Sequence, residues 1–215
     1  MARSVGEGFN LLVFIVFLHL VFPLLCNSET CTKINSCVCK FSNGSVINLT
    51  PLASKDTARW RDKATSTNDT YRYFYNPCFD FKEGPADSPL EDCSTEVAAC
   101  QVSPDHKLYY NLGNQASAQF HWNNTGNVLQ LVYQAPHTRK QTNVTLVCSS
   151  ESSSPKLDVL GEINSGSEHY VFNLITKCAC PDGCPLTSPH TDRGLSTGSV
   201  LILIFFIFLT IYVIG

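Results

Sequence analysis

Short apolar stretches, separated by turn-forming residues, follow one another through the middle of the chain. In residues 141–148, Val144 and Leu146 share a face with Cys148, because successive side chains of a strand point to opposite faces. Asn143 lies on the other face and begins an Asn-Val-Thr sequon, so we expect that face to be outside. Further candidate strands lie at 46–49, 72–75, 108–112, 127–133 and 169–175.

This spacing of short strands predicts an all-β fold, and no sustained helical apolar stripe precedes the C-terminal tail. We expect a flattened barrel or sandwich of two antiparallel sheets, stapled by disulfides. The polar segment 56–63 predicts a short helix or a loop.

Both ends of the chain are apolar. The run at 11–25 follows Arg3 and is too short for an ordinary spanning helix, so it predicts a signal peptide over residues 1–28. Cleavage after the small residue Ser28 fits this pattern, and an uncleaved anchor is the alternative.

The C-terminal run at 200–214 contains Thr210 as its only polar residue. With the uncharged residues just before it, the run reaches the length that a bilayer requires. We expect a linker at 186–198 and a transmembrane helix at 199–215. This sequence contains no cytosolic tail after the helix, so the chain is incomplete, a variant or reliant on a partner for sorting. The alternative is a glycolipid-anchor signal, which the missing polar spacer disfavours.

Cysteines are abundant, with eleven in 215 residues. Cys26 leaves with the signal peptide, and an even number behind such a peptide predicts disulfides in an oxidising compartment. Zinc binding is disfavoured, because no histidine stands at ligand spacing beside the Cys37-x-Cys39 and Cys178-x-Cys180 pairs. The ten remaining cysteines are Cys31, Cys37, Cys39, Cys78, Cys93, Cys100, Cys148, Cys178, Cys180 and Cys184.

Charge and motif content exclude several functions. The formal net charge is −3 and no Lys/Arg block occurs, so the chain lacks the electrostatic footprint of a nucleic-acid-binding protein. Histidines are scattered, with no nucleophile motif beside them, so we expect neither enzymatic activity nor a metal or other cofactor. Glycosylation sequons begin at Asn43, Asn48, Asn68, Asn123 and Asn143.

A series of short motifs runs in order from Cys39 onward. The motifs are Cys39 to Leu52 with its Leu49-Thr50-Pro51-Leu52 end, Asn76-Pro77-Cys78, Ala98-Ala99-Cys100-Gln101, Leu112-Gly113, Thr142 to Cys148, Tyr170-Val171-Phe172 and Ala179-Cys180-Pro181. This ordered set resembles the mannose 6-phosphate receptor homology (MRH) domain family, and the C-terminal tail is similar to the membrane anchor of those receptors. The resemblance implies one lumenal domain over residues 29–185.

The resemblance also implies three disulfides. They would join Cys39 to Cys78, Cys93 to Cys100, and Cys148 to Cys180. The other four lumenal cysteines would tie the two ends of the domain, with their pairing open.

Sugar-binding members of the family hold mannose with a Gln, an Arg, a Glu and a Tyr. The matching positions are Gln101, Lys140, Glu162 and Tyr170, with Glu168 as an alternative carboxylate. Lys140 stands in the Arg position, where an ammonium cannot reproduce a planar, two-pronged contact. The neighbouring Arg139 has the opposite strand parity.

The resemblance leads to two functional hypotheses. The first is a single-pass type I membrane receptor that binds mannose-containing, possibly phosphorylated, glycoproteins for transport from the Golgi to endosomes and lysosomes. The second is a non-lectin membrane protein of the same route that acts through protein–protein contacts.

Overall fold

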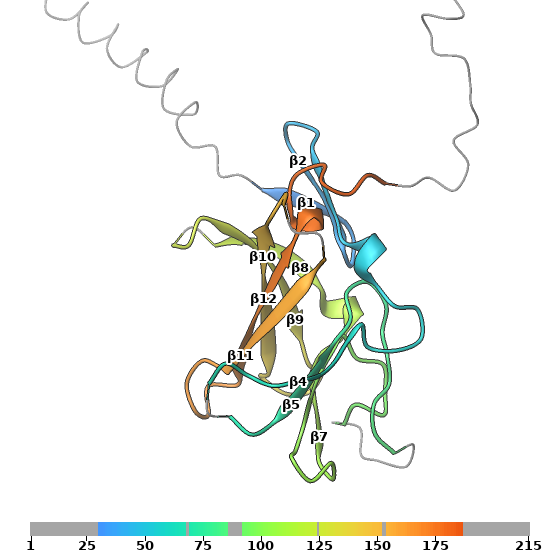
Figure 1. Cartoon of the computed structure of the whole chain (residues 1–215), viewed down its shortest axis with the longest axis vertical. Coiled ribbons are helices and arrows are strands. Elements are labelled where there is room, and N and C mark those ends of the chain that lie inside the picture. Colours follow the sequence, from blue (N-terminus) through green and yellow to red (C-terminus); the bar gives the residue numbers. More distant parts are fainter. Residues whose placement is uncertain (1–29, 68, 86–91, 124, 152–153, 187–215) are drawn as a thin grey trace, which may run out of the picture. The chain divides into compact units, whose positions relative to one another are not determined.

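The computed structural model describes residues 30–67, 69–85, 92–123, 125–151 and 154–186 (Figure 1). The secondary structure of these residues consists of twelve strands in three sheets and three short 3-10 helices. The 3-10 helices are η1 (Thr50–Leu52), η2 (Gln115–Ser117) and η3 (Lys177–Ala179). The all-β class is therefore confirmed.

The first sheet is a small antiparallel unit at the start of the described chain. Its strands are β1 (Cys31–Asn35), β2 (Val38–Phe41) and β3 (Val46–Asn48), in the order β1-β2-β3. A tight turn with Gly44 at φ +93° joins β2 to β3.

The second sheet has the order β4-β5-β6-β7 and is antiparallel. Its centre is aromatic, because Tyr73 and Tyr75 alternate with Phe74 along β5. Strand β5 ends at Asn76, whose buried side chain donates to Ser54 O at 2.7 Å and to Phe79 O at 2.8 Å. The strands are β4 (Trp60–Lys63), β5 (Arg72–Tyr75), β6 (Ala99–Val102) and β7 (Tyr109–Gly113).

The third sheet has five strands in the order β11-β12-β10-β9-β8. Strand β11 forms a hairpin with β12 on the side away from β10, so the chain leaves β10, crosses over, and returns in β12 parallel to β10. Figure 1 shows β10, β12 and β11 side by side. The strands are β8 (Gln119–Asn123), β9 (Val128–Gln134), β10 (Gln141–Cys148), β11 (Lys156–Glu162) and β12 (His169–Thr176).

The expectation of two antiparallel sheets is thus wrong in two respects. The first three strands form a sheet of their own, and the β10–β12 pair makes the five-stranded sheet mixed. The segment 56–63 is also corrected: its second half is β4, which pairs with β5 and stacks Trp60 on Tyr75 at a ring separation of 5.7 Å.

The core lies between the four-stranded and five-stranded sheets. The Phe172 ring of β12 lies 5.9 Å from the rings of both Tyr73 and Tyr75, measured between centroids. The predicted face of 141–148 is confirmed for Val144 and Leu146, which are buried, whereas Asn143 is half-buried. Apolar burial of this kind is the main force that holds two sheets together.

All ten described cysteines form disulfides. The Cys93–Cys100 and Cys148–Cys180 bridges are present as the resemblance implied. The expected Cys39–Cys78 bridge is wrong: antiparallel pairing of β1 with β2 places Cys39 next to Cys31, with 5.4 Å between the Cα atoms. The remaining bridges are Cys37–Cys78 and Cys178–Cys184.

Neither terminal prediction falls on the described part of the chain. The signal peptide at 1–28 and the membrane helix at 199–215 lie outside it. Within the described ranges, no helix has the length and apolar character needed to cross a bilayer.

Candidate functional site

A polar cavity of about 220 Å³ lies between the two larger sheets. Strand β6 contributes Gln101 from one sheet and β11 contributes Glu162 from the other. The connection between β4 and β5 supplies most of the remaining wall. The lining residues are Thr67, Asp69, Tyr71, Gln101, Glu162 and Ser165.

A chain of hydrogen bonds fixes two of these side chains. The Tyr73 hydroxyl donates to Asp69 Oδ2 at 2.5 Å, so its oxygen accepts from Gln101 Nε2 at 2.9 Å. Asp69 Oδ1 accepts from the backbone N–H of Tyr71 at 2.8 Å. Because the Gln101 amide group donates to Tyr73, its carbonyl oxygen is the atom that remains to accept a bond from a ligand.

A glycine allows the β4–β5 connection to approach β11. Gly161 has φ +82° at an irregularity in the β11–β12 pairing, a backbone conformation that side chains disfavour. A Cβ atom there would lie 3.0 Å from Thr65 Cγ2 and 3.3 Å from Asp69 Oδ2. The absence of a side chain at Gly161 therefore lets Asp69 lie beside the neighbouring Glu162.

Glu162 is held by the turn that follows it. Its Oε1 accepts a 2.7 Å hydrogen bond from the backbone N–H of Glu168, which has φ +60°. Glu162 also pairs directly with Tyr170 across β11 and β12. The carboxylate is thus aimed by the backbone before any ligand arrives, which is the usual way to lower the cost of ordering a site.

Two buried phenols next to the cavity stay protonated at neutral pH. Burial raises the pKa of Tyr170 to about 12, and the negative charges of Glu162 and Glu168 add to this rise. Burial and the hydrogen bond to Asp69 raise the pKa of Tyr73 well above its ordinary value. Both hydroxyls are therefore hydrogen-bond donors under physiological conditions.

The cavity lining carries two carboxylates and no cationic side chain among the described residues. Lys140 lies outside the lining, with its Nζ 4.8 Å from the centroid of the Tyr110 ring, a cation–π contact. Tyr110 in turn packs edge-on against Tyr71 at 6.2 Å. The neighbouring Arg139 pairs with Glu168 at 3.3 Å.

The structure thus brings together some of the residues expected from the resemblance. Gln101 and Glu162 line one cavity. Tyr170 is outside the lining, although it pairs with Glu162 and its ring lies 6.4 Å from that of Tyr73 between centroids. Lys140 is also outside the lining, and its ammonium group lies against Tyr110, which packs on the lining residue Tyr71. Asp69 was missed, because a single carboxylate in an irregular connection carries no pattern in the sequence.

The sequons differ in accessibility. Asn43 is exposed, and Asn123 and Asn143 are half-buried. Asn48 is 3% exposed, and its Nδ2 donates to Pro185 O at 3.0 Å, so it is the least accessible of the described sequon asparagines. Asn68 lies outside the described residues.

The ordered motif set and a family match define a mannose 6-phosphate receptor-like protein, which confirms the resemblance drawn from the sequence. A family model described as autophagy-related protein 27 matches residues 9–215, and the chain belongs to this family. Chicken IGF2R domain 11 is a similar solved structure, with a TM-score of 0.49 and 18% sequence identity, covering 69% of this chain and 96% of that one. A search of curated proteins finds no match.

Proposed function

We propose that this mannose 6-phosphate receptor-like protein binds neutral, mannose-type glycans of glycoproteins in the polar cavity. The observation that carries the proposal is that Gln101 and Glu162 line one cavity although they belong to different sheets. Both positions match those that hold mannose in sugar-binding members of the family.

The chemistry of the lining suits a sugar with vicinal hydroxyls. Such hydroxyls both donate and accept, and the cavity offers carboxylate acceptors in Asp69 and Glu162. Gln101 adds a carbonyl acceptor to the lining, and the Tyr170 hydroxyl, outside the lining on the residue paired with Glu162, is a donor at neutral pH. A site whose buried polar groups each bond a particular hydroxyl rejects sugars that lack it.

The charge of the lining argues for a neutral sugar over a phosphorylated one. A phosphate carries nearly two negative charges at neutral pH and would face two carboxylates. Lys140 is the only cationic residue among the four positions that match the family's sugar-binding set. Its ammonium group lies against the Tyr110 ring. Non-phosphorylated mannose is therefore the ligand that this cavity favours.

The cellular part of the proposal follows from the family and from the ends of the chain. We expect a single-pass type I protein of Golgi, endosomal or lysosomal membranes, anchored by residues 199–215 and carrying bound glycoproteins along that route. Accessibility of the domain to protease in sealed vesicles tests the orientation: the lumenal domain should be protected.

A glycan array probed with the full-length protein tests the ligand. We expect binding to oligosaccharides with terminal mannose, weaker binding when the mannose is phosphorylated, and loss of binding for Glu162→Gln. This variant keeps an oxygen to accept from Glu168 N–H, so the turn should remain intact. Asp158→Asn, on the same strand and paired with Lys156 on the surface, is the matched control and should bind normally.

One observation favours the second candidate, a domain that acts through protein–protein contacts. Lys140 lies against Tyr110 and not in the cavity, so the cationic member of the sugar-binding set is absent from the lining. If the array shows no binding to any mannose-containing glycan, the protein-contact function is the one supported.

A further inference from the structure

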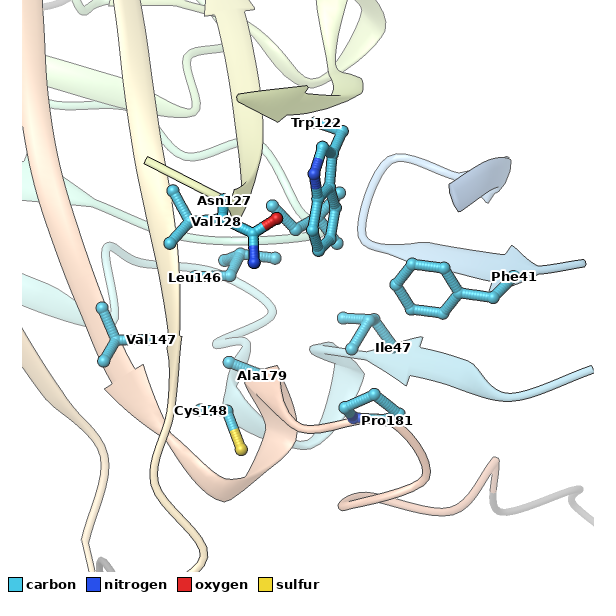
Figure 2. Close-up of a pocket in the computed structure, with 11 residues that line it drawn as sticks. Phe41, Ile47, Trp122, Asn127, Val128, Leu146, Val147, Cys148, Ala179 and Pro181 are labelled. Atoms are coloured by element: carbon cyan, nitrogen blue, oxygen red, sulfur yellow. The ribbon is translucent and has the colours of Figure 1, made fainter. Parts of the chain in front are cut away.

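A second pocket, of about 280 Å³, lies at the opposite ends of β10 and β12 from the polar cavity and is almost entirely apolar. Figure 2 shows Phe41 and Ile47 projecting from the three-stranded sheet toward Trp122 of β8. The Phe41 and Trp122 rings are in edge-on contact, with 6.4 Å between their centroids. Leu146 and Pro181 are among the other lining residues. Covering exposed apolar surface of this kind is favourable, because it removes that surface from water.

The tight turn between β2 and β3 places a glycosylation sequon beside this pocket. Gly44 N–H donates to Phe41 O at 3.0 Å, and Phe41 N–H donates to Ser45 O at 2.9 Å. Gly44 adopts φ +93°, a backbone conformation that favours glycine because a Cβ atom would be strained there. The five residues of the turn therefore contain the sequon Asn43-Gly44-Ser45, two positions after an aromatic side chain.

Strand pairing puts the aromatic ring and the sequon on one face. Phe41 and Ser45 are directly opposite each other across the hairpin, and opposed residues share a face. Ile47, two positions after Ser45, is on the same face and lines the pocket. Asn43 Oδ1 accepts from Ser45 Oγ at 2.7 Å and from Ser45 N at 2.9 Å, so the Asn43 side chain leans toward this face.

We propose that Asn43 carries an N-linked glycan whose first N-acetylglucosamine stacks on Phe41 and covers the apolar pocket next to Trp122. The C–H face of a pyranose ring is apolar and packs on an aromatic ring much as another hydrophobic group does. The occupant of the pocket is then the chain's own glycan, held over it by a covalent bond.

The attachment chemistry uses the atom that the turn leaves available. In transfer from a lipid-linked oligosaccharide diphosphate, a bond forms between Asn43 Nδ2 and sugar C1. The bond from C1 to the lipid diphosphate breaks, the diphosphate leaves, and one Nδ2 proton is released. Oδ1 remains an amide oxygen, so both bonds from Ser45 survive and hold the glycosylated side chain in place.

The other sequons do not share this arrangement. Asn143 is preceded at the same spacing by Gln141, whose Nε2 donates to Asn143 Oδ1 at 2.7 Å. Asn123 is preceded by His121 at that spacing. Asn143 therefore serves as a matched control, since a glycan there has no aromatic side chain two positions before it.

A double-mutant cycle on the full-length glycoprotein tests the proposal. The protein is made in a glycosylating secretory host, and its glycans are trimmed to single N-acetylglucosamine units. Unfolding in urea is then compared for the parent, Asn43→Gln, Phe41→Leu and the double variant. Asn43→Gln should raise the unfolding equilibrium constant in both backgrounds. The factor of increase should be roughly five times larger when Phe41 is present than in the Phe41→Leu background. The bonds from Ser45 are lost in both backgrounds and cancel.

The same cycle with Asn143→Gln should show equal changes in both backgrounds. Two results would overturn the proposal: peptide mass spectrometry that finds Asn43 unmodified, or an Asn43→Gln effect that does not depend on Phe41. If Phe41→Leu fails to fold, NMR of the parent decides: ring-current shifts of the Asn43-linked sugar protons support the stacking, and their absence excludes it.

Discussion

The two ends of the β10–β12 pair are built from different chemistry. At the end that holds the apolar pocket, four of the five disulfides involve the three-stranded sheet, the β1–β2 turn or the segment that begins with η3. At the other end, the polar cavity is held by hydrogen bonds among Asp69, Tyr73 and Gln101 and by the turn around Glu162. One end is therefore fixed covalently, while the other is held in place by hydrogen bonds among ionisable groups.

The largest expected effect on stability comes from removing a disulfide at the end that holds the apolar pocket. Replacing Cys148 and Cys180 with Ala opens a bridge with a sequence separation of 32 and should cost about 2–4 kcal/mol of stability, because the unfolded chain regains entropy. Replacing Cys178 and Cys184, whose separation is 6, should cost less. Urea unfolding measures both.

Glycan binding provides the contrast for these disulfide variants. Under conditions where each variant is folded, binding should match the parent, since the cavity lies at the other end of the strands. A variant that folds but no longer binds glycan would show that the two ends are coupled, which contradicts their independence.

The next largest effect should come from Tyr73→Phe. The variant removes the hydroxyl that links Asp69 to Gln101 and should cost about 1–3 kcal/mol, with a marked loss of glycan binding. Tyr75→Phe is the control: it breaks the buried 3.2 Å bond between the Tyr75 and Tyr133 hydroxyls and should reduce stability without changing glycan affinity.

Alkaline pH should destabilise the domain through its buried tyrosines. Folding raises the pKa of Tyr170 to about 12, so its contribution to stability is complete below about pH 10 and is lost as the pH rises through the folded value. Tyrosinate absorbance followed in parallel with unfolding checks this. Asp69→Asn removes a charge that opposes ionisation of Tyr73 and Tyr170, so tyrosinate should form at lower pH.

The smallest effect is expected for Lys140→Ala. Loss of the contact with the Tyr110 ring should cost about 0.5–1 kcal/mol of stability and leave mannose binding almost unchanged, because Lys140 is outside the cavity. Calorimetric titration with a mannose-terminated oligosaccharide measures the binding. A large loss of affinity would place the ammonium group at the sugar.

The strands that could be predicted were those with strong patterns. Residues 141–148 alternate cleanly and coincide with β10, and the aromatic run at 72–75 coincides with β5. Six strands were missed: β1, β2, β4, β6, β8 and β11. Among them, Trp60–Lys63 and Gln119–Asn123 are short and mostly polar, and their pairing depends on neighbours far along the chain.

The pairing of Cys37 and Cys39 and the place of Asp69 in the cavity could not be predicted from the sequence, because both depend on contacts between distant segments. Cys37 and Cys39 are two residues apart, and only the register of β1 against β2 assigns one to Cys78 and the other to Cys31. Gln101 and Glu162 followed from family motifs, whereas Asp69 reaches the cavity because Gly161 permits a close approach.

Titration of the full-length protein with a mannose-terminated oligosaccharide, followed by NMR, tests the central claim most directly. The account predicts saturable shifts at Gln101, Glu162 and Tyr170, abolished by Glu162→Gln and retained in Asp158→Asn. Shifts that survive Glu162→Gln, or tighter binding of the phosphorylated sugar than of the neutral one, would contradict it.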